Sequence, residues 1–272
     1  MSPSDLTSFA ALKAWLGLPA QAGPNDSTLA ALITAASRAV YAHLSRPALT
    51  PQTYTETIDL ETHRVFLRQW PVLDVSWVTW RGISIPVCQN ADLDASSGYA
   101  LQPADATPPG RPQALDLVGG YYRPGRQSLV VSYTAGYAVQ GEVQTVSNSP
   151  YQVTASMPFG SWASDLGVTY AATGAALTPV AAAPSAGQYV ASNGIYTFGA
   201  ADAGNSMVLS YGYVPQDIAQ ATLELAAARF RAAEHIGLTS KSIGGQETIA
   251  YDSSAMPPAV LAMLQPYMRV AV

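Results

Sequence analysis

Few side chains in this sequence have the types and spacing that metal binding needs. The three histidines, His43, His63 and His235, have no cysteine or second histidine at metal-ligand spacing, and only a nearby glutamate in two cases. Residues adjacent on a helix do not face one another, so these pairs do not form a ligand set. We interpret the histidines as isolated surface residues and predict no metal site.

Two loops share single features with ligand-binding motifs. Ile243-Gly244-Gly245 lacks the lysine and the spacing of a phosphate loop. Asp202, in the segment ADAGN, lacks the further carboxylates that a calcium loop supplies, so it is interpreted as a turn residue. No G-x-S-x-G segment marks a nucleophile. The sequence therefore predicts no catalytic residue and no cofactor.

Aromatic and basic side chains offer weaker binding possibilities. Tryptophans can stack on sugars, but apolar helix and strand faces predict core packing for four of the five: Trp15, Trp70, Trp77 and Trp80. Trp162 is predicted to lie exposed in a loop. Arg229, Arg231 and Lys241 form a small basic set that can contact phosphate, although a solvated helix face is the default explanation.

The composition is poor in charge. The chain has 272 residues, of which 11% are charged and 49% hydrophobic, with a net charge of −5. Two explanations stay open: a subunit that buries much of its surface in an assembly, or an alanine-rich protein from a GC-rich genome. The absence of a Lys/Arg run argues against a sequence-reading nucleic-acid binder. The single Cys88 excludes an intrachain disulfide.

No apolar stretch is long enough to predict a membrane span. The first residues, MSPSDLTSF, have neither the basic segment nor the apolar segment of a signal peptide. We expect synthesis in the cytoplasm and no membrane partner.

One sequence pattern occurs twice in similar form. Residues 128–138 read SLVVSYTAGYA and residues 206–218 read SMVLSYGYVPQDI, and only the second continues through Pro215 into a helical pattern. We interpret this as a strand-turn-helix unit opened at its turn, with a separate β-rich module inserted at residues 139–213. The predicted domains are 1–138 plus 214–272, and 139–213. Insertion at an exposed turn is well tolerated.

The helical patterns lie at both ends of the chain. Thr7 or Ser8 can cap a first helix that ends at Gly17, and Asp26 can cap a second that ends before Pro47. A longer helix is predicted from Pro215 or Asp217 to about Ile236. A stripe of small and apolar residues on this helix suits close approach of a second subunit or of the chain's own β-region: Ala221, Leu225, Ala228 and Ala232.

Strand patterns fill the middle. Alternation predicts short strands within residues 53–80, with 86–127 rich in loops. In the module, five runs read as strands, and Asn193-Gly194 predicts a tight hairpin between two of them. The predicted class is α+β: a helical body with short strands and an inserted small sandwich or barrel.

Three segments, in this order, resemble the head–tail connector, or adaptor, proteins of tailed bacteriophages. They are DLTSFAALKAWLGLP…NDSTLAALITAASRAVYAHLSRP (5–47), VFLRQWPVLDVSWVTWRG (65–82) and YGYVPQDIAQATLELAAARFRAAEHIGLTSKSIGGQETIAY…PPAVLAMLQPYMR (211–269). The module, with GQYVASNGIYTF and ADAGNSMVLSYGY, looks like a β-domain that recurs in phage structural proteins. The module is the departure from the connector pattern.

The resemblance implies a virion protein of the neck without catalytic activity. It implies a homo-oligomeric ring, expected to be a dodecamer, beneath the portal protein and above a neck or tail-completion protein. Double-stranded DNA would pass through the lumen without sequence recognition, beside Arg229, Arg231 and Lys241. It also implies that the C-terminal segment docks on the portal through Leu261, Leu264, Tyr267, Met268 and Val270.

We expect that segment to be loosely packed in the free chain. Two rival functions stay open: a virion-surface carbohydrate-binding protein that uses Trp162, and a hydrolase with dispersed catalytic residues.

Overall fold

The computed structural model describes residues 4–88, 97–103, 107–120, 122–233, 240–243, 247–250 and 256–269. The described residues are mostly β, with 39% in strands and 25% in helices, so the predicted helical body with a long C-terminal helix is wrong. Strands in the middle of the chain are up to eleven residues long and enclose cores of their own. Two units emerge: Met1–Pro47 with Gln216–Met268, and Ala48–Pro215 with Arg269–Val272.

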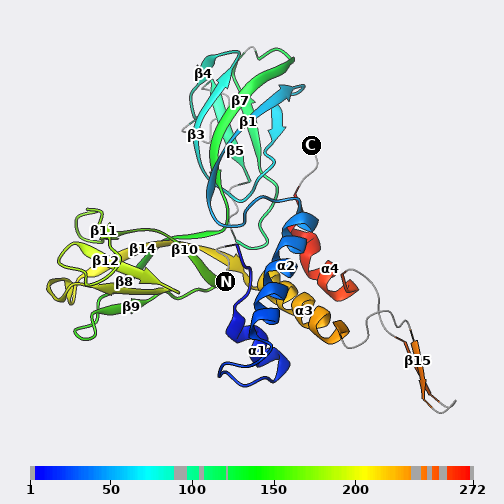
Figure 1. The fold of residues 1–272 in the computed structure, drawn as a ribbon. Coiled ribbons are helices and arrows are strands. Elements are labelled where there is room, and N and C mark those ends of the chain that lie inside the picture. The colour runs from blue at the N-terminus through cyan, green and yellow to red at the C-terminus, as the bar shows by residue number, and fades with distance from the viewer. Residues whose placement is uncertain are drawn as a thin grey trace. The chain divides into compact units, whose positions relative to one another are not determined.

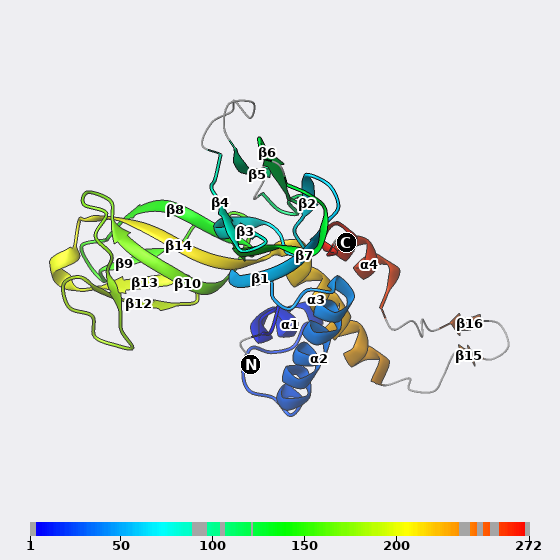
Figure 2. The same ribbon diagram turned by 90° about the horizontal axis from the view of Figure 1, so that it is seen from above.

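The first unit is helical. It contains α1 (Phe9–Leu16), α2 (Asp26–Leu44), α3 (Gln216–Ala232) and α4 (Pro258–Leu264), which runs into a 3-10 turn, η3 (Gln265–Tyr267) (Figure 1). α3 contacts each of the other three helices and is therefore the central element of this unit (Figure 2). The unit also carries an antiparallel hairpin of β15 (Ser240–Ile243) and β16 (Glu247–Ala250). None of the described helices is long and apolar enough to cross a membrane.

Local signals define the first two helices. The Ser8 side chain accepts the amide of Ala11, and Gly17 closes α1 in the left-handed conformation, as predicted. Asp26 is the first residue of α2 rather than its cap. Its carboxylate lies 2.8 Å from the Nζ atom of Lys13, which also donates to the carbonyl of Gln21 at 2.7 Å. Lys13 is almost completely buried, so this ion pair fixes the loop between the helices.

The second unit begins with seven strands around one core. They are β1 (Gln52–Leu60), β2 (Arg64–Phe66), β3 (Val72–Trp80), β4 (Ile83–Ile85), β5 (Gly98–Gln102), β6 (Ala114–Val118) and β7 (Gly125–Ala135). The strand orders are β1-β7-β3-β4 and β2-β6-β5. A bridge between Val87 and Tyr99 links the β4 side to β5. The result is a partly open barrel, whose open seam lies between β1 and β2.

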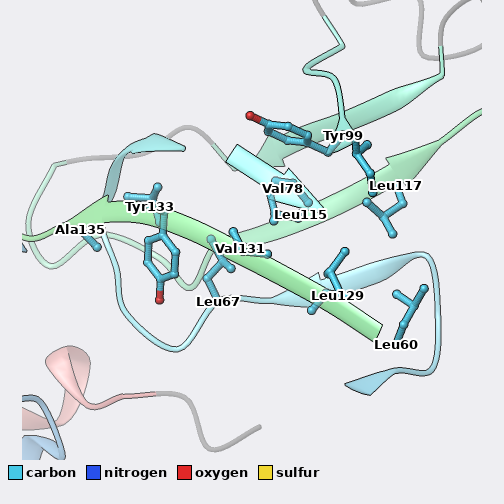
Figure 3. Close-up of a cluster of buried hydrophobic side chains, with 13 residues drawn as sticks. Leu60, Leu67, Val78, Tyr99, Leu115, Leu117, Leu129, Val131, Tyr133 and Ala135 are labelled. Atoms are coloured by element: carbon cyan, nitrogen blue, oxygen red, sulfur yellow. The ribbon is translucent and has the colours of Figure 1, made fainter. Parts of the chain in front are cut away.

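Side chains from both sheets fill the barrel. Leu67, Val78, Leu115, Leu129 and Val131 are all fully buried and gather between the strands (Figure 3). β1 follows the predicted alternation, with Thr55 and Thr57 exposed on the other side. In β3 two bulges, between Val72 and Asp74 and between Val75 and Trp77, interrupt the alternation. β5 and β6 lie in the stretch that the proline content had predicted to be loop, and they complete the core.

The rest of the second unit is a β-sandwich. β8 (Ala138–Thr145), β10 (Gly160–Tyr170) and β14 (Ser206–Pro215) form one sheet in the order β10-β14-β8. β9 (Gln152–Thr154), β11 (Thr178–Pro179), β12 (Gln188–Ser192) and β13 (Ile195–Phe198) form the other, in the order β11-β12-β13-β9. A short 3-10 turn, η1 (Ala200–Asp202), precedes β14. Figure 2 shows the two layers, which enclose a core of their own.

The predicted hairpin is confirmed. Ser192 pairs with Ile195, and both Asn193 and Gly194 have positive φ values, 49° and 81°. Positive φ at both turn positions is the requirement of a type I′ turn, which Asn-Gly satisfies well.

The ends of the sandwich meet. Ala138, at the start of β8, pairs with Gly212 near the end of β14, and the Tyr213 amide donates to the Tyr137 carbonyl. β14 ends at Pro215 and α3 begins at Gln216, with no loop between them. The pairing brings together the two chain positions between which the sequence predicts an insertion; the domain boundaries themselves stay a prediction.

Candidate interaction surfaces

The small-residue stripe on α3 divides into two halves. Ala221 and Leu225 are fully buried, whereas Ala228 is half-buried and Ala232 is exposed. Only the C-terminal half of the stripe therefore offers surface to a second subunit. The role of these four residues in a subunit interface stays a prediction.

The basic set is not a single patch on the described residues. Arg229 is half-buried and Arg231 is exposed in the last turn of α3. Cations at this end of a helix interact favourably with its dipole, which is sufficient to explain their position. Lys241 lies in β15, and the structure does not describe its side chain. Contact of the three with DNA stays a prediction.

The C-terminal segment packs against the helical unit. Val260, Leu264 and Tyr267 are all 1% exposed or less, and the Tyr267 hydroxyl donates to Asp217 Oδ2 in α3 at 2.8 Å. The expectation of a loosely packed segment is therefore wrong, because α4 contributes to the packing around α3. Leu261 and Met268 remain exposed, at 37% and 42%, and can still contact a partner. Val270 lies outside the described residues.

Three carboxylates in the sandwich are each bound by a tyrosine. Residues 139–213 contain no lysine, arginine or histidine. Hydroxyl groups take the place of cations: Tyr211 donates to Glu142 at 2.7 Å, Tyr170 to Asp202 at 2.6 Å and Tyr189 to Asp165 at 2.5 Å. Each acidic side chain of the sandwich thus has a partner within the sandwich, and we assign these pairs to stability.

The pKa values of these tyrosines reflect the arrangement. Burial and the bonded carboxylate raise the pKa of Tyr211 to about 12. The same two causes raise the pKa of Tyr189, with burial the larger. All of these phenols stay protonated at neutral pH and act as donors. Asp165 and Tyr189 also line a shallow groove of about 440 Å³ at the β10 edge, where Leu166 is exposed.

The tryptophans differ from the sequence prediction in several places. Trp162 lies in β10 rather than in a loop, is half-buried, and donates its Nε1 hydrogen to Tyr196 at 3.1 Å. Its position therefore differs from the exposed loop position on which the carbohydrate-binding alternative depends. Trp15 and Trp77, predicted to be core residues, are 49% and 43% exposed, while Trp70 is buried.

The open seam of the barrel forms a groove of about 530 Å³. Four consecutive residues of β1, Glu56 to Asp59, and all three residues of β2 line it. Glu56 accepts the Tyr133 hydroxyl at 2.6 Å, and Arg64 lies 3.4 Å from Asp116 and over the ring of Phe66. This groove has no counterpart in the sequence prediction, because it depends on how two sheets meet.

The histidines have simple surroundings. His43 is half-buried in the last turn of α2 and His63 is exposed between β1 and β2, whereas His235 lies outside the described residues. Within the described part of the chain, no three His, Cys, Asp or Glu residues gather in a way that would hold a metal ion.

Large apolar side chains are exposed in both units. The helical unit exposes Trp15, Leu261 and Met268, and the β unit exposes Phe66, Trp77, Ile83, Val87, Val143, Phe159, Leu166 and Ile195. Single exposed apolar residues are common on soluble proteins, but this chain has only 11% charged residues. Such a surface is prone to association.

No protein-family model matches the chain, and no curated protein is similar to it in sequence. Among solved structures, the chain is similar to a component of the virion of a native gene transfer agent particle. The alignment covers 100% of this chain and 94% of the other, with 15% identity and a TM-score of 0.40. A likeness at this TM-score carries no argument about the present chain.

Proposed function

We propose that this chain is a structural virion protein that acts as a head-to-tail adaptor. Copies form a ring, expected to be a dodecamer, beneath the portal protein, extend the DNA channel and present the attachment surface for a neck or tail-completion protein. The protein is synthesised in the host cytoplasm and is located in the neck of the assembled virion. The three connector-like segments, which occur in the order of that family, support this identification.

The observation that carries the proposal is the association-prone surface. Both units expose large apolar side chains on a chain with only 11% charged residues. A protein that functions alone rarely keeps such a surface in water, whereas a ring subunit covers it with neighbours. In the helical unit, Ala232 together with the exposed Trp15, Leu261 and Met268 supplies candidate contacts.

Structural assembly also fits the chemistry of the described residues. The acidic side chains of the sandwich are held by tyrosines, and Glu56 in the barrel groove is held by Tyr133. Groups that catalyse are normally available to a substrate, whereas these are committed to internal hydrogen bonds. The sandwich would decorate the ring.

Reconstitution with the portal tests the proposal. The purified chain is mixed with portal rings of the same virus, and the products are analysed by native mass spectrometry and electron microscopy. We expect a closed ring of this chain on one end of the portal. A chain that stays unbound at high concentration, or that binds elsewhere on the particle, would show that it is not the adaptor.

A further inference from the structure

The groove between β1 and β2 is bounded by two strand edges. Side chains of a strand alternate between its two faces, so a groove on one face would contact every second residue. This groove instead contacts Glu56, Thr57, Ile58 and Asp59 in succession, and Arg64, Val65 and Phe66 in succession. Only the edge of a strand is adjacent to consecutive residues. The groove therefore runs along the edges of both strands.

Each of these edges lacks a neighbour in the described sheets. β1 pairs only with β7, and β2 pairs only with β6. An exposed edge is a template for another strand, and proteins usually protect it with proline, lysine or a bulge. Gln52–Leu60 contains neither proline nor lysine, and its pairing with β7 is regular from Gln52 to Ile58, with an irregularity only between Ile58 and Leu60 at the end of the strand. The edge is thus suited to accept a strand.

A strand donor of matching length exists in the chain itself. The β15–β16 hairpin has four residues in each strand, and the β1 edge offers four residues to the groove. In the described sheets β15 pairs only with β16. A two-stranded hairpin is marginally stable in water, and it gains stability when a third strand joins it. Neither hairpin strand contains proline.

We propose that the β15–β16 hairpin of one copy adds as strands to the β1 edge of a second copy, within the groove between β1 and β2. Each copy then donates one hairpin and accepts one, which is the head-to-tail contact that a closed ring repeats. Main-chain hydrogen bonds supply the affinity, as in other cases of strand addition. The inference rests on the proposed ring, for which it names the contact between subunits.

Disulfide trapping between two differently labelled chains tests the contact. Cys88 is replaced by serine, and one full-length chain then receives Thr57→Cys in β1 while another receives Ser242→Cys in β15. The two are mixed with and without portal rings, and oxidised. We expect a crosslinked dimer of one chain of each kind. The matched control replaces Thr57→Cys by Ser84→Cys, on the exposed edge strand β4, and should give no dimer.

The possible outcomes separate the inference from the ring. A ring on the portal without the Thr57–Ser242 crosslink overturns the hairpin contact and leaves the adaptor function intact. A third chain carries both Thr57→Cys and Ser242→Cys, and if its crosslink forms only within the same chain, the groove belongs to its own hairpin and the inference is overturned. The intermolecular crosslink without binding to the portal supports the contact and contradicts the adaptor function.

A hairpin deletion supplies an independent readout. Replacing residues 240–250 by a short glycine-containing turn should leave the thermal unfolding of the chain unchanged and abolish assembly. Unimpaired assembly of this variant would overturn the inference.

Discussion

Tyr211 donates its hydroxyl to Glu142 Oε2 at 2.7 Å, between two neighbouring strands of the sandwich. The other carboxylate oxygen accepts the amide and hydroxyl of Ser156 and the side-chain amide of Gln144. One carboxylate thus joins β8, β14 and the segment after β9 without a cation.

Because of this carboxylate, we expect the thermal stability of the sandwich to decrease at acidic pH. Burial alone would raise the pKa of Glu142, but the four donated hydrogen bonds outweigh it and lower the pKa. A lowered folded-state pKa adds stability that is complete above the unfolded value of about 4.3 and is lost as the pH falls through the folded value. We expect the Tm to fall in that range, and Glu142→Gln to lower the Tm at pH 7 and to flatten its dependence below pH 5.

Glu61→Gln, at an exposed position between β1 and β2, is the matched control and should change neither. Tyr211→Phe should cost about 1 kcal/mol at neutral pH, because Glu142 keeps its other donors and is partly exposed to water. An unaltered pH profile of Glu142→Gln would show that the acid response originates elsewhere.

The pairing of Ala138 with Gly212 predicts that the sandwich can be removed. Replacing Gln140–Tyr211 by a short glycine-containing turn should leave the barrel and the helices folded, since the two cut ends already lie side by side. Circular dichroism and a single cooperative unfolding transition check this. Loss of cooperativity would contradict the insertion, whereas folded chains that build defective particles would give the sandwich a role in the neck.

The two halves of the α3 stripe should respond differently to charge. Ala221→Glu places an unpaired carboxylate at a fully buried position. An uncompensated buried charge should destabilise the fold by about 3–5 kcal/mol. Ala228→Glu and Ala232→Glu should leave the Tm within a few degrees but impair ring assembly. Native mass spectrometry and thermal unfolding separate the two effects. Equal loss of folding in all three would make the whole stripe ordinary core.

The C-terminal segment should likewise separate stability from binding. Leu264→Ala is expected to destabilise the chain by about 2–5 kcal/mol, since Leu264 is fully buried. Truncation after Ala255 should lower the Tm for the same reason. Leu261→Asp and Met268→Asp change exposed positions, so they should preserve the Tm and weaken binding to portal rings. Undiminished binding of the double variant would remove the segment from the portal contact.

Local signals were predictable from the sequence. Ser8 and Gly17 bound α1, Asn193-Gly194 forms its hairpin, and β3 spans the predicted residues 72–80, because each of these depends on neighbouring residues alone. β10 was missed because it combines two bulges, near Ser164 and Gly167, with glycine and aspartate residues that are rare in strands, whereas β3 also has two bulges but is rich in valine and tryptophan.

Features that depend on distant parts of the chain were not predictable. The barrel core needs β5 and β6, which lie 30 or more residues after β1 and between proline-rich segments. To predict the groove at the seam, one would need to know that β1 and β2 belong to different sheets, although only Glu61–His63 separates them in the sequence. The tyrosine–carboxylate pairs join residues 24 to 69 positions apart. The sequence does show that residues 139–213 lack cations, but not that tyrosines would bind the three carboxylates.

The cation-free sandwich also has a consequence for proteolysis. Arg126 and Arg229 are consecutive among the lysines and arginines of the chain, so trypsin has no site from Gln127 to Ala228. Even a fully unfolded chain would release this stretch as one fragment, which spans β8 to β14 and most of α3. Digestion by trypsin therefore reports on the barrel strands before β7 and on the C-terminal segment, and a protease that cleaves after aromatic residues is needed to follow the opening of the sandwich.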